Sequence, residues 1–162
     1  MMNSSTHQRT APGPRWPDPL QPPDPAHVES LLGDFWRYLR RLPDLLLRHE
    51  YLLADQLVAQ VRFTVTELML ALNGIRWPVA TTHLNSYLSQ SQRTALQKTL
   101  LLPEISAEAW IGCAVALVVI YRWYAPQLVQ RFGLVYPQPL EDETLAHLQQ
   151  TLADWPLSIT TE

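Results

Sequence analysis

The chain has 162 residues, enough for one domain with a buried core. Hydrophobic residues make up 47% of it and charged residues 17%, which is ordinary for a globular protein and argues against a fully disordered chain. The net charge of −3 at pH 7 argues against the basic stripe of a nucleic-acid-binding protein, so nucleic acid is not expected as a partner.

Proline dominates the beginning of the chain. Residues 1–25 hold seven of the fourteen prolines and almost no aliphatic residues. Such a segment cannot bury enough apolar surface to offset the entropy lost on ordering. We therefore predict a disordered proline-rich arm over residues 1–25, suited to wrapping a partner, followed by one helical bundle domain over residues 26–157. The opening MMNSSTHQRTAPGPRWP also lacks the apolar run of a signal peptide.

The first half of the domain is predicted to hold two helices. The first should begin at Asp24-Pro25, because aspartate is a good N-cap and proline is favoured at the first helical position. Pro43 is expected to end or kink it. A long second helix is predicted over residues 44–73, where leucine and valine recur at steps of three, four and seven. Gly74 suits its left-handed cap, and Trp77-Pro78 enforces a break.

The second half is predicted to hold the remaining helices. Two shorter ones are expected near residues 80–89 and 92–101. A longer helix over about residues 106–132 should be kinked or divided by Pro126. A last helix is expected over about residues 140–155, with acidic residues in its first turn. Together these elements predict an all-α helical bundle of five or six helices.

The longest apolar run, AWIGCAVALVVIY, spans residues 109–121. It is shorter than the roughly 20 residues that a membrane-spanning helix needs, so we expect a buried core helix and no membrane contact. Cys113 lies within this run, where a cysteine behaves as an inert small hydrophobe. It is the only cysteine, so no intrachain disulfide can form and a reducing, cytoplasmic location is expected.

Charged residues inside the long helix are the first candidates for a binding site. Arg62 and Glu67 lie among apolar neighbours, and long charged side chains are rarely buried without a partner. A structural ion pair across the bundle and a ligand-facing pair both remain open. The polar cluster at residues 48–51 is interpreted as solvated charges beside the core stripe, since neighbours in a helix point in different directions.

Catalytic and metal-binding patterns are weak. Arg76 and His83 have the Arg-x6-His spacing of HEPN-type ribonucleases, but the apolar, proline-broken WPVATT between them departs from that motif. No HExxH or paired-carboxylate spacing accompanies the histidines, so we predict neither a metal site nor catalytic residues. Trp77 lies in a turn beside a proline, where an aromatic ring anchors the fold or caps a pocket. The histidines are scattered over His7, His27, His49, His83 and His147.

Three segments share features with a known domain. Residues 23–74 combine an acidic-Phe-Trp helix with a long helix that carries an internal arginine. Residues 70–78, LALNGIRWP, form an asparagine-then-aromatic-proline turn, and residues 120–152 contain a closing helix, a glycine, a Tyr-Pro and a last helix. Together they resemble, over about residues 22–155, the C-terminal helical domain of bacterial nucleotidyltransferases related to the aminoglycoside adenylyltransferases.

The resemblance implies that the catalytic residues lie in a domain other than this one. Such enzymes transfer AMP or another nucleotidyl group from a nucleoside triphosphate with Mg²⁺, using carboxylates of an N-terminal α/β domain that follow a Gly-Ser turn. This chain has no Gly-Ser dipeptide, and its acidic-x-acidic match, Glu141-Asp142-Glu143, falls at a predicted helix start. Two-metal chemistry needs carboxylates on a rigid strand. We therefore expect a non-catalytic substrate-binding or accessory domain that binds no cofactor alone and contributes to catalysis only as part of a nucleotidyltransferase.

The expected partner is a catalytic nucleotidyltransferase subunit, which would hold the Mg²⁺ and nucleoside triphosphate, or a second copy of this chain. A departure from the family pattern is Thr82-His83, where relatives tend to have Lys-Trp, and it weakens the case for a triphosphate contact there. The alternative is a helical protein-interaction module, antitoxin-like or HEPN-like, with no small-molecule site. The predicted substrate-binding residues are Arg62, Glu67, Asn73, Trp77 and His83.

Overall fold

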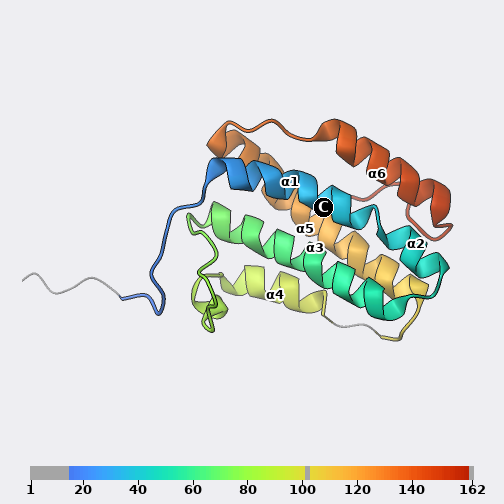
Figure 1. Ribbon diagram of the computed structural model, residues 1–162, viewed down its shortest axis with the longest axis horizontal. Helices are drawn as coiled ribbons and strands as arrows, with labels where there is room; N and C mark the ends of the chain where they lie inside the picture. The colour runs from blue at the N-terminus through green and yellow to red at the C-terminus, as the bar shows by residue number, and fades with distance from the viewer. Residues whose placement is uncertain (1–14, 101–102, 161–162) are drawn as a thin grey trace, which may run out of the picture.

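The computed structural model describes residues 15–100 and 103–160, and these residues form helices and loops with no strand among them (Figure 1). The predicted all-α fold class is confirmed. The helices of the described part are α1 (Pro25–Leu39), α2 (Leu42–Leu47), α3 (Tyr51–Leu72), the short 3₁₀ turn η1 (Leu84–Ser86), α4 (Gln90–Lys98), α5 (Ala107–Phe132) and α6 (Gln138–Thr151).

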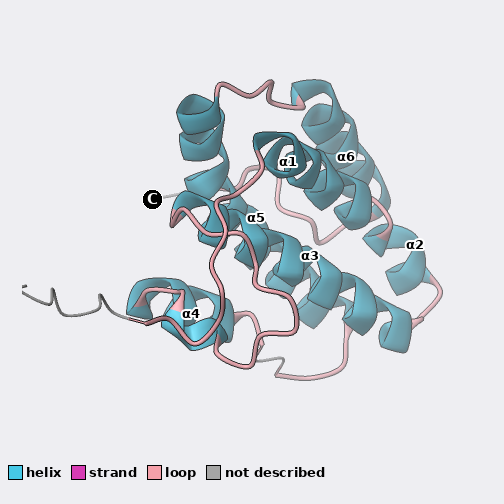
Figure 2. Ribbon diagram, turned by 60° about the vertical axis from the view of Figure 1, so that its left-hand side comes forward, coloured by secondary structure: helices cyan, strands magenta, loops and turns pink. Residues whose placement is uncertain are grey.

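Helix α3 is the centre of the bundle. It packs most extensively against α5 and α1, and it also contacts α2 and α4. Helix α6 packs on α1, so α1 lies between α3 and α6. In both overall views α4 lies at the edge of the bundle, away from α6 (Figure 1 and Figure 2). This arrangement leaves one side of α3 facing α4 and the loops before it.

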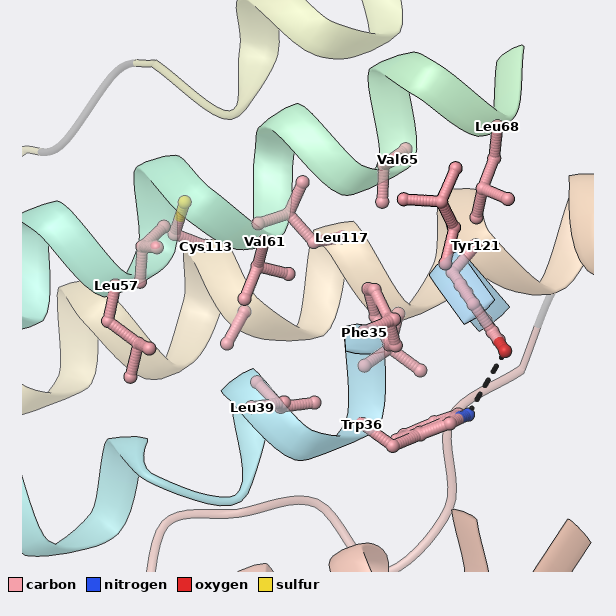
Figure 3. Packing of buried hydrophobic residues seen from close by; sticks show 14 of the residues in the cluster. Phe35, Trp36, Leu39, Leu57, Val61, Val65, Leu68, Cys113, Leu117 and Tyr121 are labelled. Carbon is pink, nitrogen blue, oxygen red and sulfur yellow. Dashed lines mark hydrogen bonds between the residues drawn. The ribbon is translucent and has the colours of Figure 1, made fainter. Parts of the chain in front are cut away.

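The core holds an aromatic cluster where α1 meets α5 (Figure 3). The Phe35 ring stacks on Tyr121 at a centroid distance of 4.0 Å, and the Trp36 ring meets Tyr121 edge-on. Trp36 Nε1 donates to the Tyr121 hydroxyl at 3.2 Å, which in turn donates to the Leu32 carbonyl at 2.9 Å. Burial raises the pKa of the Tyr121 hydroxyl, so it remains a donor. The polar atoms of this cluster therefore satisfy one another inside the core.

The predicted helix over residues 44–73 is wrong at its first turns. Pro43 lies in the first turn of α2, and His49 then adopts a left-handed φ of 56°, which separates α2 from α3. A left-handed residue interrupts the helical hydrogen-bond ladder. Leu46 before the break and Leu57 after it are both buried, so the apolar spacing continues across the break and does not reveal it.

The predicted helix over residues 80–89 is also wrong, because that segment contains only the 3₁₀ turn at Leu84–Ser86. The next helix begins one residue after Ser89. The Ser89 hydroxyl accepts from the Gln92 backbone N–H, and the Gln92 side chain accepts from the Ser89 backbone N–H. This reciprocal capping box fixes the start of α4. The predicted end of that helix at Leu101 lies outside the described residues.

Helix α5 continues through Pro126 to Phe132, so the proline does not begin a new segment. Gly133 ends it with a left-handed φ of 62°, as the glycine position predicts. By length and composition α5 is sufficient to cross a membrane. Half of its most apolar stretch is nevertheless buried within the domain, where it packs along α3. That placement is typical of a core helix.

The described part of the proline-rich arm contacts the domain. Asp24 caps α1 through a hydrogen bond from the Ala26 backbone N–H, as predicted. Upstream, the Asp18 carboxylate accepts from the Thr81 and Tyr87 hydroxyls, both at 2.6 Å. The expectation of a disordered arm over residues 1–25 is therefore corrected for residues 15–24, which form no helix but are tied to the loop before α4. Residues 1–14 lie outside the described residues.

This contact predicts a pH dependence. The hydrogen bonds, first from Thr81 and then from Tyr87, hold the pKa of the Asp18 carboxyl below its ordinary value of 3.8. A lowered folded-state pKa stabilises the fold above the unfolded-state pKa, and that contribution is lost as the pH falls through the folded-state pKa. We expect Asp18→Asn to lower the melting temperature at neutral pH. The difference in melting temperature between Asp18→Asn and the unaltered protein, measured by circular dichroism, should disappear below about pH 3.8. A difference that stays constant with pH would contradict this role of the Asp18 carboxylate.

Candidate functional site

Two neighbouring hollows lie along the side of α3 that faces α4 and the loop after α3. The α3–α4 pocket has a volume of about 350 Å³, and the α1–α3 groove is wider, at about 870 Å³. Ala59 and Phe63 of α3 and Trp77 of the loop line both. The Phe63 and Trp77 rings have centroids 5.3 Å apart and a tilt of 40°. This aromatic pair is the wall between the hollows.

The α3–α4 pocket is mainly apolar, with two guanidinium groups among its lining. Four leucines line it: Leu84, Leu88, Leu96 and Leu100. Arg62 comes from α3 and Arg93 from α4. Its volume is at the small end of the range of ligand pockets.

Arg62 is anchored to the end of α4. Its Nε donates to Thr99 Oγ1 at 2.7 Å, and its Nη2 donates to the Thr99 carbonyl at 2.8 Å. Thr99 is the C-cap residue of α4, and carbonyls at a helix C-terminus lack partners and carry partial negative charge. The Cys113 thiol donates to the same carbonyl at 3.0 Å, and burial raises the pKa of that thiol. The partner of Arg62 is thus a helix end, and no ion pair with Glu67 forms.

Arg93 is a pocket residue that the sequence reasoning missed. Its Nε is buried and has no hydrogen-bond partner, and its guanidinium joins no ion pair within residues 15–100 and 103–160. The available signal was helical spacing, because Arg93 precedes Leu96 by three residues and Leu100 by seven. That spacing places Arg93 and Leu96 on the face of α4 that lines the pocket, and Leu100 lines it from two residues beyond the end of α4.

The α1–α3 groove contains charges of both signs. Glu67 Oε2 lies 2.8 Å from His27 Nε2 of α1, which is the cross-bundle pairing that remained open for Glu67. Arg76 and Thr81 of the loop after α3 line the same groove. The loop is held near Gln21 by a hydrogen bond from the Arg76 backbone N–H to the Gln21 carbonyl. An aromatic wall, a carboxylate and a guanidinium therefore face one open surface.

Three of the five predicted substrate-binding residues, Arg62, Glu67 and Trp77, line these hollows, and two do not. Asn73 Nδ2 donates to the Tyr87 carbonyl and to Gln92 Oε1, so it ties the end of α3 to the start of α4. His83 is exposed, and its backbone N–H donates to Thr81 Oγ1. Arg76 lines the groove and His83 does not, so neither hollow unites the pair with HEPN-like spacing.

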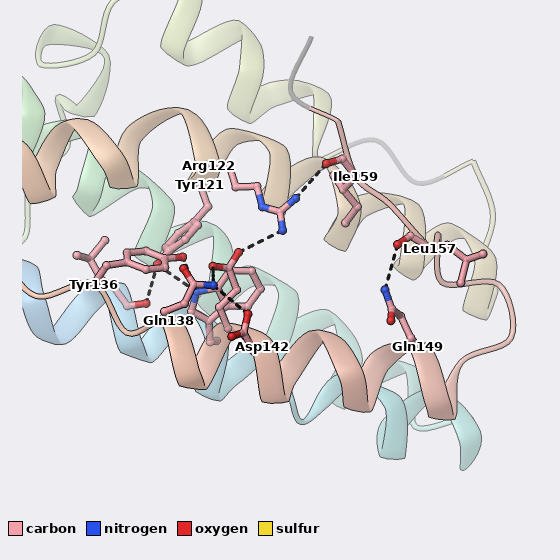
Figure 4. Close-up of polar contacts among 11 residues, drawn as sticks. Tyr121, Arg122, Tyr136, Gln138, Asp142, Gln149, Leu157 and Ile159 are labelled. Atoms are coloured by element: carbon pink, nitrogen blue, oxygen red, sulfur yellow. Dashed lines mark hydrogen bonds and ion pairs between the residues drawn. The ribbon is translucent and has the colours of Figure 1, made fainter.

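A second polar cluster holds the C-terminal segment (Figure 4). Arg122 Nη2 lies 3.1 Å from Glu141 Oε1, and Arg122 Nη1 donates to the Ile159 carbonyl at 3.0 Å. Gln138 Nε2 donates to the other carboxylate oxygen of Glu141. Burial raises the pKa of the adjacent Tyr136 hydroxyl to about 12. These groups are hydrogen-bonded to one another, so we interpret the cluster as a structural contact that holds α5, α6 and the C-terminal segment together.

Comparison with known proteins gives no relative, since no family model, no curated protein and no solved structure matches the chain. Within the described residues, no three side chains of histidine, cysteine, aspartate or glutamate are grouped so that they could hold a metal ion. The function must therefore be argued from the two hollows and the residues that line them.

Proposed function

We propose that this chain is a non-catalytic helical domain that supplies one wall of a substrate site and works with a separate catalytic nucleotidyltransferase part. The observation that carries the proposal is the α1–α3 groove, which is wide, open and lined by Glu67, Arg76 and Trp77. An open surface with charges of both signs and an aromatic ring suits a polar ligand that a second body encloses.

The position of the groove supports this proposal. The segments that carry the nucleotidyltransferase resemblance include residues 23–74, which fold into α1, α2 and α3, and residues 70–78, which form the turn after α3. Helix α1 contributes His27 to the groove, and the turn contributes Trp77 and Pro78. Two of the three resembling segments therefore meet at the groove.

Mg²⁺ and a nucleoside triphosphate are assigned to the catalytic partner. The donor set of the groove does not fit Mg²⁺, which takes near-octahedral oxygen ligands and usually binds carboxylates together with phosphates. Glu67 is the carboxylate of the groove, and it is already in contact with His27. No step of nucleotidyl transfer is derived for this chain.

The proposal predicts that the purified chain transfers no nucleotide, because it lacks the metal-binding carboxylates of that chemistry. Incubation with Mg²⁺, labelled ATP and an aminoglycoside panel should give transfer at the level of a blank. The chain recovered from its source cell with its natural partner should give transfer above the blank. The proposal would be contradicted if the chain alone transferred nucleotide and a point mutation within the chain abolished that transfer.

A matched pair of variants tests the groove itself. Glu67→Gln should reduce transfer by the recovered complex without altering recovery of the partner, because Glu67 lines the groove and its exposed pair with His27 adds less than about 1 kcal/mol to stability. Arg48→Gln, which changes an exposed arginine that lines neither hollow, is the control. A partner devoid of nucleotidyl transfer activity would contradict the proposal.

A different observation favours the alternative, a helical protein-interaction module without a small-molecule site. Leu47 at the end of α2 and Leu52 and Leu53 at the start of α3 are all exposed, with Leu52 86% exposed. Exposed leucines near one another are typical of contact surfaces. Light scattering of the purified chain distinguishes a monomer from a self-associated form. If the chain self-associates through this surface, Leu52→Asp should abolish the association.

A further inference from the structure

The α3–α4 pocket contains positive charge that nothing in its lining balances. Arg62 and Arg93 line it, and none of the described residues that line it is acidic. The two guanidinium groups differ in what they bind. Arg62 is held by Thr99, whereas Arg93 Nε is buried without a hydrogen-bond partner. The Arg93 guanidinium also joins no ion pair among the described residues, so the pocket is electrostatically suited to an anion.

The remainder of the pocket is suited to a flat apolar body. Phe63 is 57% exposed and forms a tilted pair with Trp77 on one side, and Leu84 and Leu88 also line the pocket. Aromatic rings pack well on tilted or offset aromatic walls. A volume of about 350 Å³ limits the ligand to a small molecule.

We propose that the α3–α4 pocket binds a small aromatic carboxylate, with its ring against the Phe63–Trp77 pair and its carboxylate on the Arg93 guanidinium. A guanidinium and a carboxylate form paired, charge-assisted hydrogen bonds, and Arg93 is the guanidinium of the pocket that no described carboxylate pairs. The fixed guanidinium of Arg62 adds to the positive potential of the pocket. This inference does not rest on the proposed function, because Arg93 does not line the α1–α3 groove.

Binding can be tested with 2-naphthoate and two matched compounds, the neutral 2-naphthamide and the cationic 2-(aminomethyl)naphthalene. Titration of the full chain is followed by NMR through the indole N–H signal of Trp77, assigned with Trp77→Phe. We expect 2-naphthoate to saturate this signal with a Kd of about 1 mM or tighter, as its size allows. The amide should bind at least about tenfold more weakly, and the cation more weakly still.

Variants then locate the contact. Arg93→Gln should weaken 2-naphthoate binding at least about tenfold, the loss expected for a hydrogen bond to a charged group. Arg48→Gln, an exposed arginine at the end of α2, is the matched control and should leave binding unchanged. Phe63→Leu should weaken all three compounds, because it removes the aromatic wall. Absence of saturable binding, equal binding of acid and amide, or unchanged binding by Arg93→Gln would each overturn the proposal.

Discussion

Replacing Trp36 with alanine should lower the free energy of unfolding by about 3–5 kcal/mol, the usual cost of removing a large buried aromatic side chain. Trp36 is fully buried, packs edge-on against Phe35 and Tyr121, and donates from Nε1 to the hydroxyls of Tyr121 and Tyr136. The change leaves a cavity between α1 and α5. It also removes a donor from the buried Tyr121 hydroxyl and the partly buried Tyr136 hydroxyl. Urea unfolding followed by circular dichroism measures the loss.

A matched tryptophan provides the control. Trp123 lies on α5 and is 56% exposed, so Trp123→Ala should change the free energy of unfolding by no more than about 0.5 kcal/mol. Equal effects of the two substitutions, or a loss below about 1 kcal/mol for Trp36→Ala, would show that the aromatic cluster does not stabilise the bundle as described.

Replacing Arg62 with alanine should cost about 1.5–3 kcal/mol, the range for hydrogen bonds made by a charged group. A loss of about 3–5 kcal/mol is typical of a broken buried ion pair, because the remaining charge is left unpaired. The partners of Arg62 are the neutral hydroxyl and carbonyl of Thr99, so Arg62→Ala leaves no unpaired charge behind. The Cys113 thiol still donates to the Thr99 carbonyl in this variant. The free energy of unfolding should therefore fall by the smaller of these two amounts, about 1.5–3 kcal/mol.

The loss of stability in Arg62→Ala should be concentrated at α4. Amide hydrogen exchange near Thr99 should accelerate in Arg62→Ala, while exchange in α1 changes little. Arg62→Lys should not restore protection, since an ammonium group cannot reproduce the fork of Nε and Nη2. Arg48→Ala is the control for an exposed arginine. Uniform acceleration through the whole domain, or none, would contradict a local role at the end of α4.

Helix type and most helix starts could be predicted because their causes are local. Asp24 and Pro25 predict the start of α1, and Gly133 predicts the end of α5, since capping depends on neighbouring residues. The capping box of Ser89 and Gln92 was also present in the sequence and would have placed the start of α4. The turn at His49 was hidden because a left-handed residue other than glycine has no strong sequence signal.

The candidate site was predictable only in part, because its roles depend on contacts between distant elements. The position of Arg62 beside the apolar stripe indicated a constrained arginine, but its partner, Thr99, lies 37 residues away at a helix end that the sequence did not place. Glu67 likewise pairs with His27 at a separation of 40 residues. Arg93 was missed because an arginine on a short polar helix resembles any solvated charge.

The wall shared by the two hollows is a structural basis for coupling between ligands that bind in them. Phe63 and Trp77 line both the α3–α4 pocket and the α1–α3 groove, and their rings pack against each other. A ligand that changes the tilt of Trp77 in the pocket therefore also reshapes the groove. If occupancy of the pocket alters affinity in the groove by some factor, occupancy of the groove must alter affinity in the pocket by the same factor. The sign of that factor depends on whether the two ligands favour the same tilt.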